Sequence, residues 1–279
     1  MRAAVLGHPV AHSLSPVLHT AAYRALGLDG WEYGVHDVTE EALKGFLGGL
    51  DQSWAGLSLT MPLKQVVIPQ LDHVEPLAQA VGAVNTVLFS RTGTIGTNTD
   101  VHGIVAALRE GLGTARVSDA VILGGGATAA SALAAVAELG CPSARVFVRS
   151  LDRIGPLREA VARMGVSPSF EVFDDEATTS ALAAADAVVS TMPKHAADGW
   201  ATLLADRTAR SGVPPRGVLL DVVYDPRPTA LQSAWTRRGG RAVGGERMLL
   251  HQAAEQVRLM TGSTAPLEAM DRALQAALG

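Results

Sequence analysis

The stretch that most constrains the fold of this chain is residues 121–135, VILGGGATAASALAA. A short apolar run ends at three glycines and continues into an Ala/Leu-rich segment, which predicts a strand, a tight turn and a helix. Gly124, Gly126 and Ala129 match the G-x-G-x-x-[G/A] pattern, whose small residues allow the turn, the approach of a pyrophosphate and close helix packing. The helix N-terminus would offer free N–H groups to phosphates. The sequence therefore predicts a dinucleotide-binding turn, although similar glycine-rich turns also occur where no nucleotide binds.

The composition limits the class of protein. A chain of 279 residues is long enough for two domains, and its 48% hydrophobic and 18% charged residues exclude a disordered chain. No apolar run approaches the roughly 18 residues of a membrane helix, and the N-terminus does not resemble a signal peptide. The single cysteine, Cys141, suits a reducing compartment, and a net charge of -4 without a basic stripe argues against nucleic-acid binding. We expect a soluble, cytoplasmic protein with a small-molecule ligand and no membrane or nucleic-acid partner.

Two units of alternating strands and helices follow each other along the chain. In the first we expect strands at 3–7, 31–36 and 56–60, helices at 16–26, 40–47 and 62–68, a hairpin at 86–97 and a helix at 101–111. In the second we expect strands at 120–123, 145–148, 171–173, 187–190, 218–222 and 241–243, a loop at 212–215, and closing helices at 246–261 and 266–278. The alternation in the second unit favours a parallel sheet covered on both faces.

Two serines lie just before the first predicted helix, in the stretch GHPVAHSLSP (7–16). The hydroxyls of Ser13 and Ser15 could donate to a ligand carboxylate, or one of them could cap the helix, which is the commoner use of serine at such a place. The two histidines of this stretch are separated by a proline, which argues against a helix that would bring them together. We therefore expect no metal site here.

Further polar side chains follow other predicted strands of the first unit. Lys64, in SLTMPLK (58–64), comes after a strand and beside a predicted helix N-terminus, where open α/β sheets bind ligands. Such a place suits acid–base chemistry, whereas most lysines simply lie in solvent. Asn85, Asn98 and Asp100, in GAVNT and GTNTD, are each typical of a turn or of a helix cap. Together they supply donors and acceptors for a polyhydroxylated substrate.

In their order and spacing, these motifs and the glycine-rich turn resemble the shikimate dehydrogenase family. The resemblance continues through DVVYDPRPTAL (221–231) and GERMLLHQ (245–252), and so extends over essentially the whole chain. It implies an α/β fold of two domains, with residues 1–102 and 245–279 forming a substrate domain and residues 103–244 a Rossmann-type domain. It also implies reversible hydride transfer between a nicotinamide cofactor and a cyclohexene carboxylate, the shikimate step of chorismate and aromatic amino acid biosynthesis.

The resemblance also implies roles for individual residues. Lys64 and Asp100 flank the reacting hydroxyl as an acid–base pair, which agrees with the proton that this oxygen must gain or lose. The implied substrate contacts are to the carboxylate from Ser13, Ser15 and Tyr224, and to the ring hydroxyls from Thr60, Asn85, Asp100 and Gln252. The implied cofactor contacts are Gly124, Gly126, Ala127, Ala129 and Thr191, with Gly245 and Met248 near the nicotinamide. The sequence departs from the family in having Ser58 and Val148 where asparagine is common.

The choice of cofactor depends on the end of the second strand of the Rossmann unit. Enzymes that select NAD normally have a carboxylate there, about 20 residues beyond the glycines. This chain instead has Arg149, Ser150 and Arg153, whose guanidinium and hydroxyl groups suit a 2′-phosphate. Two solvated arginines are the alternative, but positive charge at a helix start opposes the helix dipole. We expect NADP, with Asp152 the one carboxylate able to reach the ribose if the turn is shifted.

Three other functions remain in view. A quinate or quinate/shikimate dehydrogenase would share the fold and the pair of Lys64 and Asp100. A non-catalytic nucleotide-sensing protein would have no need of either residue. An unrelated Rossmann reductase would lack the polar motifs that precede the glycine-rich turn. The leading prediction is an NADP-dependent shikimate dehydrogenase that acts as a monomer or a homodimer.

Overall fold

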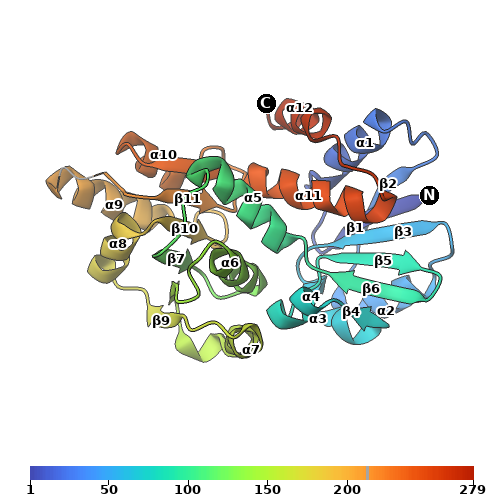
Figure 1. Ribbon diagram of the computed structural model, residues 1–279, viewed down its shortest axis with the longest axis horizontal. Coiled ribbons are helices and arrows are strands. Elements are labelled where there is room, and N and C mark those ends of the chain that lie inside the picture. Colours follow the sequence, from blue (N-terminus) through green and yellow to red (C-terminus); the bar gives the residue numbers. More distant parts are fainter. Residues whose placement is uncertain (212–213) are drawn as a thin grey trace. The chain divides into compact units, whose positions relative to one another are not determined.

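The computed structural model describes residues 1–211 and 214–279, those at 207–211 by their backbone alone. The chain divides into two compact units, one formed by Met1–Gly103 with Leu249–Gly279 and the other by Ile104–Met248. Each unit is α/β and contains one six-stranded sheet (Figure 1). Of the loop expected at 212–215, residues 212 and 213 lie outside the described residues. Among the described residues, no helix combines the length and apolar character needed to span a bilayer.

The sheet of the first unit is mixed, in the order β2-β1-β3-β5-β6-β4. Its strands are β1 (Arg2–Gly7), β2 (Glu32–Asp37), β3 (Trp54–Leu59), β4 (His73–Val74), β5 (Thr86–Ser90) and β6 (Gly93–Thr97). β1 pairs in parallel with β2 and β3, whereas β5 is antiparallel to both β3 and β6. The hairpin expected at 86–97 is therefore present. Because β3 is buried along its whole length, the residues that follow it begin next to the core.

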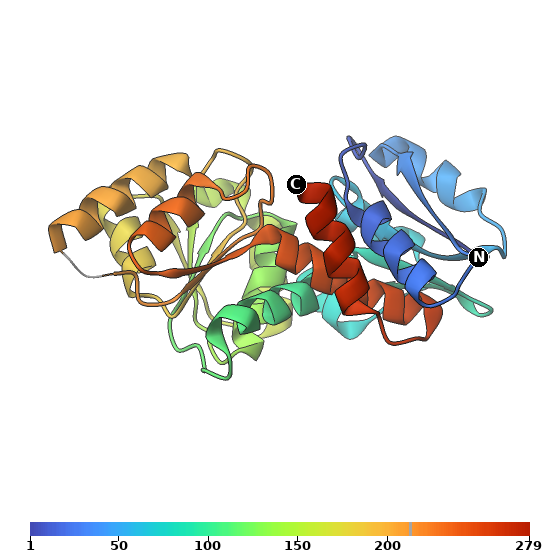
Figure 2. The same cartoon turned by 90° about the horizontal axis from the view of Figure 1, so that it is seen from above.

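The helices of the first unit come from both ends of the chain. They are α1 (Ser15–Ala25), α2 (Glu40–Gly48), α3 (Leu63–Val66), α4 (Pro76–Val81), α12 (Leu267–Leu278) and most of α11 (Gly245–Thr261). α12 lies beside α1, as Figure 2 shows in red and blue. Leu18 and Tyr23 of α1 share an apolar cluster with Val257 of α11 and Leu274 of α12. The closing helices thus complete the core of the N-terminal unit.

The prediction of a single helix at 62–68 is wrong. The chain forms the four-residue helix α3 and then a separate 3-10 turn, Ile68–Gln70. Pro69 lies in the first turn of that 3-10 element, and it has no N–H with which to continue an α-helical ladder. Beyond it, β4 and α4 were not expected from the sequence, and α4 ends at Gly82 with φ of 72°.

The sheet of the second unit is parallel throughout, in the order β12-β11-β10-β7-β8-β9. Its strands are β7 (Ala120–Leu123), β8 (Arg145–Val148), β9 (Ser169–Val172), β10 (Ala187–Ser190), β11 (Val218–Asp221) and β12 (Arg241–Gly244). The chain runs outward from β7 through β8 and β9, then returns to β10 on the other side of β7. Ligands of open α/β sheets bind at this kind of reversal, outside the carboxyl ends of the strands.

Helices connect the parallel strands of the second unit. They are α5 (Asp100–Leu112), which begins in the first unit, α6 (Ala127–Glu138), α7 (Gly155–Met164), α8 (Asp175–Ala184), α9 (Asp198–Ser211) and α10 (Ala230–Arg237). Their starts follow local sequence, because Asp174 caps α8 and Thr229 forms a capping box with Gln232 in α10. The core includes Phe147 and Trp235, which are almost entirely buried.

Candidate functional site

A lysine and an aspartate form a close ion pair in the first unit. Lys64 lies in α3, just after β3, and Asp100 is the first residue of α5. Lys64 Nζ donates to Asp100 Oδ2 over 2.5 Å, and the two side chains are 18% and 6% exposed. A lysine beside a carboxylate in a site with little water can take up and release a proton at a bound oxygen. The structure thus brings together two residues that are far apart in the sequence.

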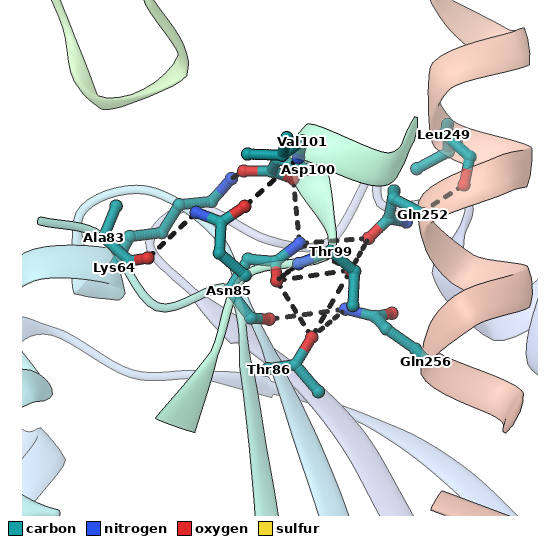
Figure 3. A network of polar contacts seen from close by, with 11 residues as sticks. Lys64, Ala83, Asn85, Thr86, Thr99, Asp100, Val101, Leu249, Gln252 and Gln256 are labelled. Atoms are coloured by element: carbon teal, nitrogen blue, oxygen red, sulfur yellow. Dashed lines mark hydrogen bonds and ion pairs between the residues drawn. The ribbon is translucent and has the colours of Figure 1, made fainter. Parts of the chain in front are cut away.

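Asn85, at the end of the segment before β5, holds the other oxygen of the aspartate (Figure 3). Its Nδ2 donates to Asp100 Oδ1 over 2.8 Å and to Thr99 Oγ1 over 2.9 Å, and contacts Gln252 Oε1 at 3.3 Å. Its Oδ1 accepts from the Thr99 amide over 2.7 Å and from Thr86 Oγ1 over 2.9 Å. The side chain of Asn85 is therefore fixed in one orientation, with its donor end toward the aspartate.

Gln256 is a member of this polar cluster that the sequence analysis missed. It is 1% exposed, and its Nε2 donates to Thr86 Oγ1 over 2.9 Å and to the Asn85 carbonyl over 3.3 Å. Its Oε1 accepts from Ser58 Oγ over 2.9 Å. The available signal was its spacing, because Gln256 lies one helical turn after Gln252 and so faces the same side of α11.

Asn98 has a structural place in the same loop. Its Oδ1 accepts from the Val101 amide over 3.2 Å, and its Nδ2 donates to the Ala83 carbonyl over 2.9 Å. It thus satisfies a free N–H in the first turn of α5. The helix-cap interpretation of this asparagine is confirmed, in contrast to Asn85, which donates to the aspartate.

Ser13, just before α1, and Ser15, its first residue, do not cap the helix in the expected way. The N-cap position is Leu14, which makes no side-chain cap, and Ser13 Oγ accepts the Ser15 amide over 3.3 Å. As acceptor in that bond, the Ser13 hydroxyl keeps its own proton for a further partner. Ser15 is 5% exposed, whereas Thr60, just after β3, is partly exposed. Both serines and Thr60 belong to the first unit, with Gln252.

Tyr224 belongs to the second unit, in the segment that follows β11. Asp221, at the end of that strand, is 2% exposed and accepts from Thr229 Oγ1 over 2.8 Å. This bond ties together the two ends of the segment that carries Tyr224. Burial, with the nearby Asp225 carboxylate, raises the pKa of the Tyr224 phenol, so its hydroxyl stays protonated and able to donate at neutral pH.

The glycine-rich turn has the geometry that the sequence predicts. Gly124 has φ of 114°, a conformation that side chains rarely adopt, and a Cβ there would overlap Thr191 Oγ1. Gly126 is the N-cap of α6 and has open space where a Cβ would point. Ala127 begins the helix, and Ala129 is fully buried. The turn therefore leaves the N–H groups at the start of α6 accessible to an anion.

Thr191 and the arginine segment lie at the carboxyl ends of β10 and β8, the two strands that flank β7. Thr191 follows β10 and donates to the Leu123 carbonyl over 2.9 Å. Arg149 follows β8 and is exposed, as is Arg153 in the 3-10 turn Leu151–Arg153. Ser150 caps that turn by accepting the Asp152 amide over 3.2 Å, which leaves its hydroxyl proton free to donate. The carboxyl end of β8 thus offers the exposed guanidinium groups of Arg149 and Arg153 and the hydroxyl of Ser150.

Gly245 and Met248 lie in the first turn of α11. A Cβ on Gly245 would overlap the Val222 carbonyl, so only glycine permits this close approach to the segment after β11. Met248 is 8% exposed. Both residues belong to the second unit, together with the glycine-rich turn.

Comparison with known proteins gives a consistent set of similarities. Residues 5–87 match the shikimate dehydrogenase substrate binding domain, and residues 245–275 match the shikimate 5'-dehydrogenase C-terminal domain. A shikimate dehydrogenase (NADP(+)) of Moorella thermoacetica is 36% identical over 99% of this chain and 93% of that relative. The one from Synechocystis sp. is 33% identical over 97% of this chain and 93% of that relative.

Solved structures are similar over nearly the full length. The shikimate dehydrogenase of Mycobacterium tuberculosis has a TM-score of 0.86 and 41% identity, with 99% of each chain covered. The Thermus thermophilus enzyme, in complex with NADP(H) and shikimate, has a TM-score of 0.82 and 32% identity, again over 99% of each chain. A quinate dehydrogenase from Corynebacterium glutamicum, in complex with NAD, has a TM-score of 0.85 and 29% identity over 99% of each chain.

Proposed function

This chain belongs to the shikimate dehydrogenase family, and from that premise we propose that it catalyses the NADP-dependent interconversion of 3-dehydroshikimate and shikimate. The observation that carries the proposal is the buried pair of Lys64 and Asp100, held by Asn85. A protein that only sensed nucleotides would have no need of such a pair. The reaction is a step in the synthesis of chorismate and the aromatic amino acids.

Lys64 is the group that we propose exchanges a proton with the reacting oxygen. As the carbonyl of 3-dehydroshikimate becomes a hydroxyl, its oxygen needs a proton, and an ammonium group can donate one. In the reverse direction the neutral amine accepts it. Asp100 supports both states, because its Oδ2 faces Nζ while Asn85 fixes its Oδ1. NADP, when bound, supplies or accepts the hydride.

The remaining polar residues of the first unit are proposed to orient the substrate. Ser13 and Ser15, with Tyr224, are assigned to the substrate carboxylate, because hydroxyl groups can donate to its oxygens. Thr60, Asn85 and Gln252 are assigned to the ring hydroxyls, together with Asp100. In support, Asn85 and Gln252 already contact each other over 3.3 Å. Residues 1–102 and 245–279 are proposed as the substrate domain.

The residues of the second unit fit NADP. We assign the pyrophosphate to the turn at Gly124, Gly126 and Ala127, because the space beside Gly126 is open and the start of α6 is positive. Arg149, Ser150 and Arg153 are assigned to the 2′-phosphate, since they are exposed or partly exposed donors at the end of β8. The further assigned residues are Ala129 and Thr191, within the proposed cofactor domain of residues 103–244, and Gly245 and Met248, which directly follow that domain in the sequence.

Quinate is the alternative substrate, because a quinate dehydrogenase with the same fold has 29% identity with this chain. The absorbance of reduced nicotinamide, measured with shikimate and quinate crossed against NADP and NAD, separates the two readings. We expect the highest kcat/KM with shikimate and NADP. A preference for quinate would assign the chain to the alternative, and no turnover of shikimate with either cofactor would overturn the main proposal.

We also propose that the protein is cytoplasmic and acts as a monomer or a homodimer. Gel filtration and light scattering would test the oligomeric state.

Replacement of the lysine tests its chemical role. We expect Lys64→Ala to lower kcat by roughly two orders of magnitude, the scale of a general acid–base group. Lys44→Ala, at an exposed position of α2 in the same unit, is the matched control and should leave kcat unchanged. Near-normal turnover by Lys64→Ala would assign the proton transfer to another group.

A further inference from the structure

A continuous series of hydrogen bonds leads from the interior of the first unit to the aspartate of the proposed site, and Figure 3 shows its part from Gln256 to Asp100. It begins where the Tyr33 hydroxyl donates to Ser58 Oγ over 2.6 Å, and Ser58 in turn donates to Gln256 Oε1 over 2.9 Å. The far end of the Gln256 amide donates to Thr86 Oγ1, and Thr86 donates to Asn85 Oδ1, both over 2.9 Å. In each of these bonds, the group nearer to Tyr33 donates and the group nearer to Asn85 accepts.

The orientation of the Gln256 amide is determined by its neighbours. Ser58 Oγ donates to its Oε1, and His19 Nε2 faces the same oxygen at 3.2 Å. Its Nε2 faces the Asn85 carbonyl, which can only accept. Burial lowers the pKa of His19 to about 3, so the imidazole is neutral, and the amide oxygen that faces its Nε2 favours the tautomer with the proton on that nitrogen. A reversed amide would put its oxygen against the Asn85 carbonyl, and neither of these acceptors has a proton to share.

This orientation fixes the next two groups. Because Thr86 Oγ1 accepts from Gln256, its single proton is left for Asn85 Oδ1. Asn85 then has its oxygen committed to Thr86 and the Thr99 amide, so its Nδ2 is directed at Asp100. Thr86 is fully buried and Gln256 is 1% exposed, so water does not compete for these bonds.

We propose that Gln256 is a positioning residue for the reaction, acting through Thr86 on Asn85 and thereby on the carboxylate that holds Lys64. The inference rests on the proposed function, because it gives Asn85 and Asp100 their importance. Gln256 itself lies behind the side chains that would touch the substrate.

The first test removes the hydrogen bond between Gln256 and Thr86 by replacing either residue. Gln256→Met keeps the length of the side chain without its hydrogen bonds, and we expect kcat to fall roughly tenfold with the KM for NADP unchanged. Thr86→Val should have a similar effect, whereas Thr86→Ser retains the hydroxyl and should stay near wild type. The control is Gln275→Met in α12, whose amide donates to Asp271 one turn earlier. A wild-type kcat in Thr86→Val would overturn the proposal.

A double-mutant cycle separates positioning from general support of the fold. If Gln256 acts through Asn85, then Gln256→Met in an Asn85→Ala background should change kcat less than twofold further, since the link is already broken. A second full loss in that background would show that Gln256 acts independently of Asn85. If Gln256→Met does not fold, the comparison of Thr86→Val with Thr86→Ser in the same background answers the same question.

An NMR readout distinguishes failure of this inference from failure of the proposed function. The side-chain amide signals of Asn85 in isotope-labelled protein, identified by their loss in Asn85→Ala, should shift in Gln256→Met and in Thr86→Val. They should stay in place in Gln275→Met. This result does not depend on turnover. Shifted signals in an enzyme without shikimate activity would refute only the proposed function, and unmoved signals in an active enzyme would refute only the role of Gln256.

Discussion

The buried histidine of α1 makes a quantitative prediction about acid sensitivity. His19 is completely buried, its ring stacks on Tyr33 with centroids 4.0 Å apart, and its Nε2 faces Gln256 Oε1 at 3.2 Å. Loss of water around the ring lowers its pKa from 6.5 to about 3, and the hydrogen bond to Gln256 opposes this only in part. The folded protein therefore binds the proton of His19 more weakly than the unfolded chain does.

The sign and size of the effect follow from linkage. Because the unfolded chain takes up the proton first, the stability that His19 contributes is complete above its unfolded pKa of 6.5 and is lost as the pH falls toward 3. Each pH unit within that window costs at most about 1.4 kcal/mol. Between pH 7 and pH 5 the loss amounts to about 2 kcal/mol, because little proton is bound above 6.5.

Urea unfolding at pH 7 and pH 5 measures this loss. Wild type and His19→Gln are compared, and we expect the variant to lose about 2 kcal/mol less than wild type between the two pH values. Comparing the change with pH, and not the absolute stability, removes the cost of the substitution itself. His19→Phe, which keeps an aromatic ring against Tyr33, repeats the test with different packing. An equal loss in wild type and in both variants would refute the assignment of this acid sensitivity to His19.

Three further predictions address the cofactor turn, the arginines and the loop before α5. Arg149→Ala should raise the KM for NADP roughly tenfold by removing a charge-assisted contact to phosphate, with little change for NAD; an equal rise for both cofactors would contradict the 2′-phosphate assignment. Gly124→Ala should weaken NADP binding, measured by titration calorimetry, and lower the melting temperature, because its Cβ would overlap Thr191 Oγ1 at a φ of 114°; Gly45→Ala, with open space in α2, is the control. Asn98→Ala should cost about 1 kcal/mol in urea unfolding through the lost cap; Asn98→Asp should not recover it, because its second carboxylate oxygen would face the Ala83 carbonyl to which Nδ2 donates.

Most of the fold could be predicted because its strands are short apolar runs bounded by turn residues. The strand expected at 120–123 is β7 without any change of bounds, and the closing helices differ by a residue at their starts. The failures lie between residues 62 and 81. There β4 has only two residues, too few for a periodic pattern, and Pro69 divides what looked like one helix. Periodicity carries no information at that length.

The site could be predicted only in part, because its motifs name residues but not their partners. Lys64 and Asp100 were both expected from their places at strand ends, and the resemblance paired them, but their contact depends on the register that sets β3 beside β5. Thr86 lies within a strand and has no local signal of function, and the only signal for Gln256 is its spacing of one helical turn from Gln252. Their importance comes from burial, which only the folded chain reveals.

Asn85 and Asn98 show what decides between two roles that look the same in a sequence. Both are asparagines next to the predicted hairpin, Asn85 just before it and Asn98 just after it, and both are buried, so each must satisfy an amide oxygen and an amide nitrogen inside the protein. Asn98 meets this demand with backbone groups, an N–H at its oxygen and a carbonyl at its nitrogen. The oxygen of Asn85 is occupied by Thr86 and Thr99, which leaves its nitrogen for the one carboxylate within reach. The two roles thus differ in the groups that donate to the side-chain oxygen, a backbone N–H of α5 for Asn98 and Thr86 with the Thr99 amide for Asn85. Thr86 accepts in turn from Gln256, so the orientation of Asn85 depends on Gln256.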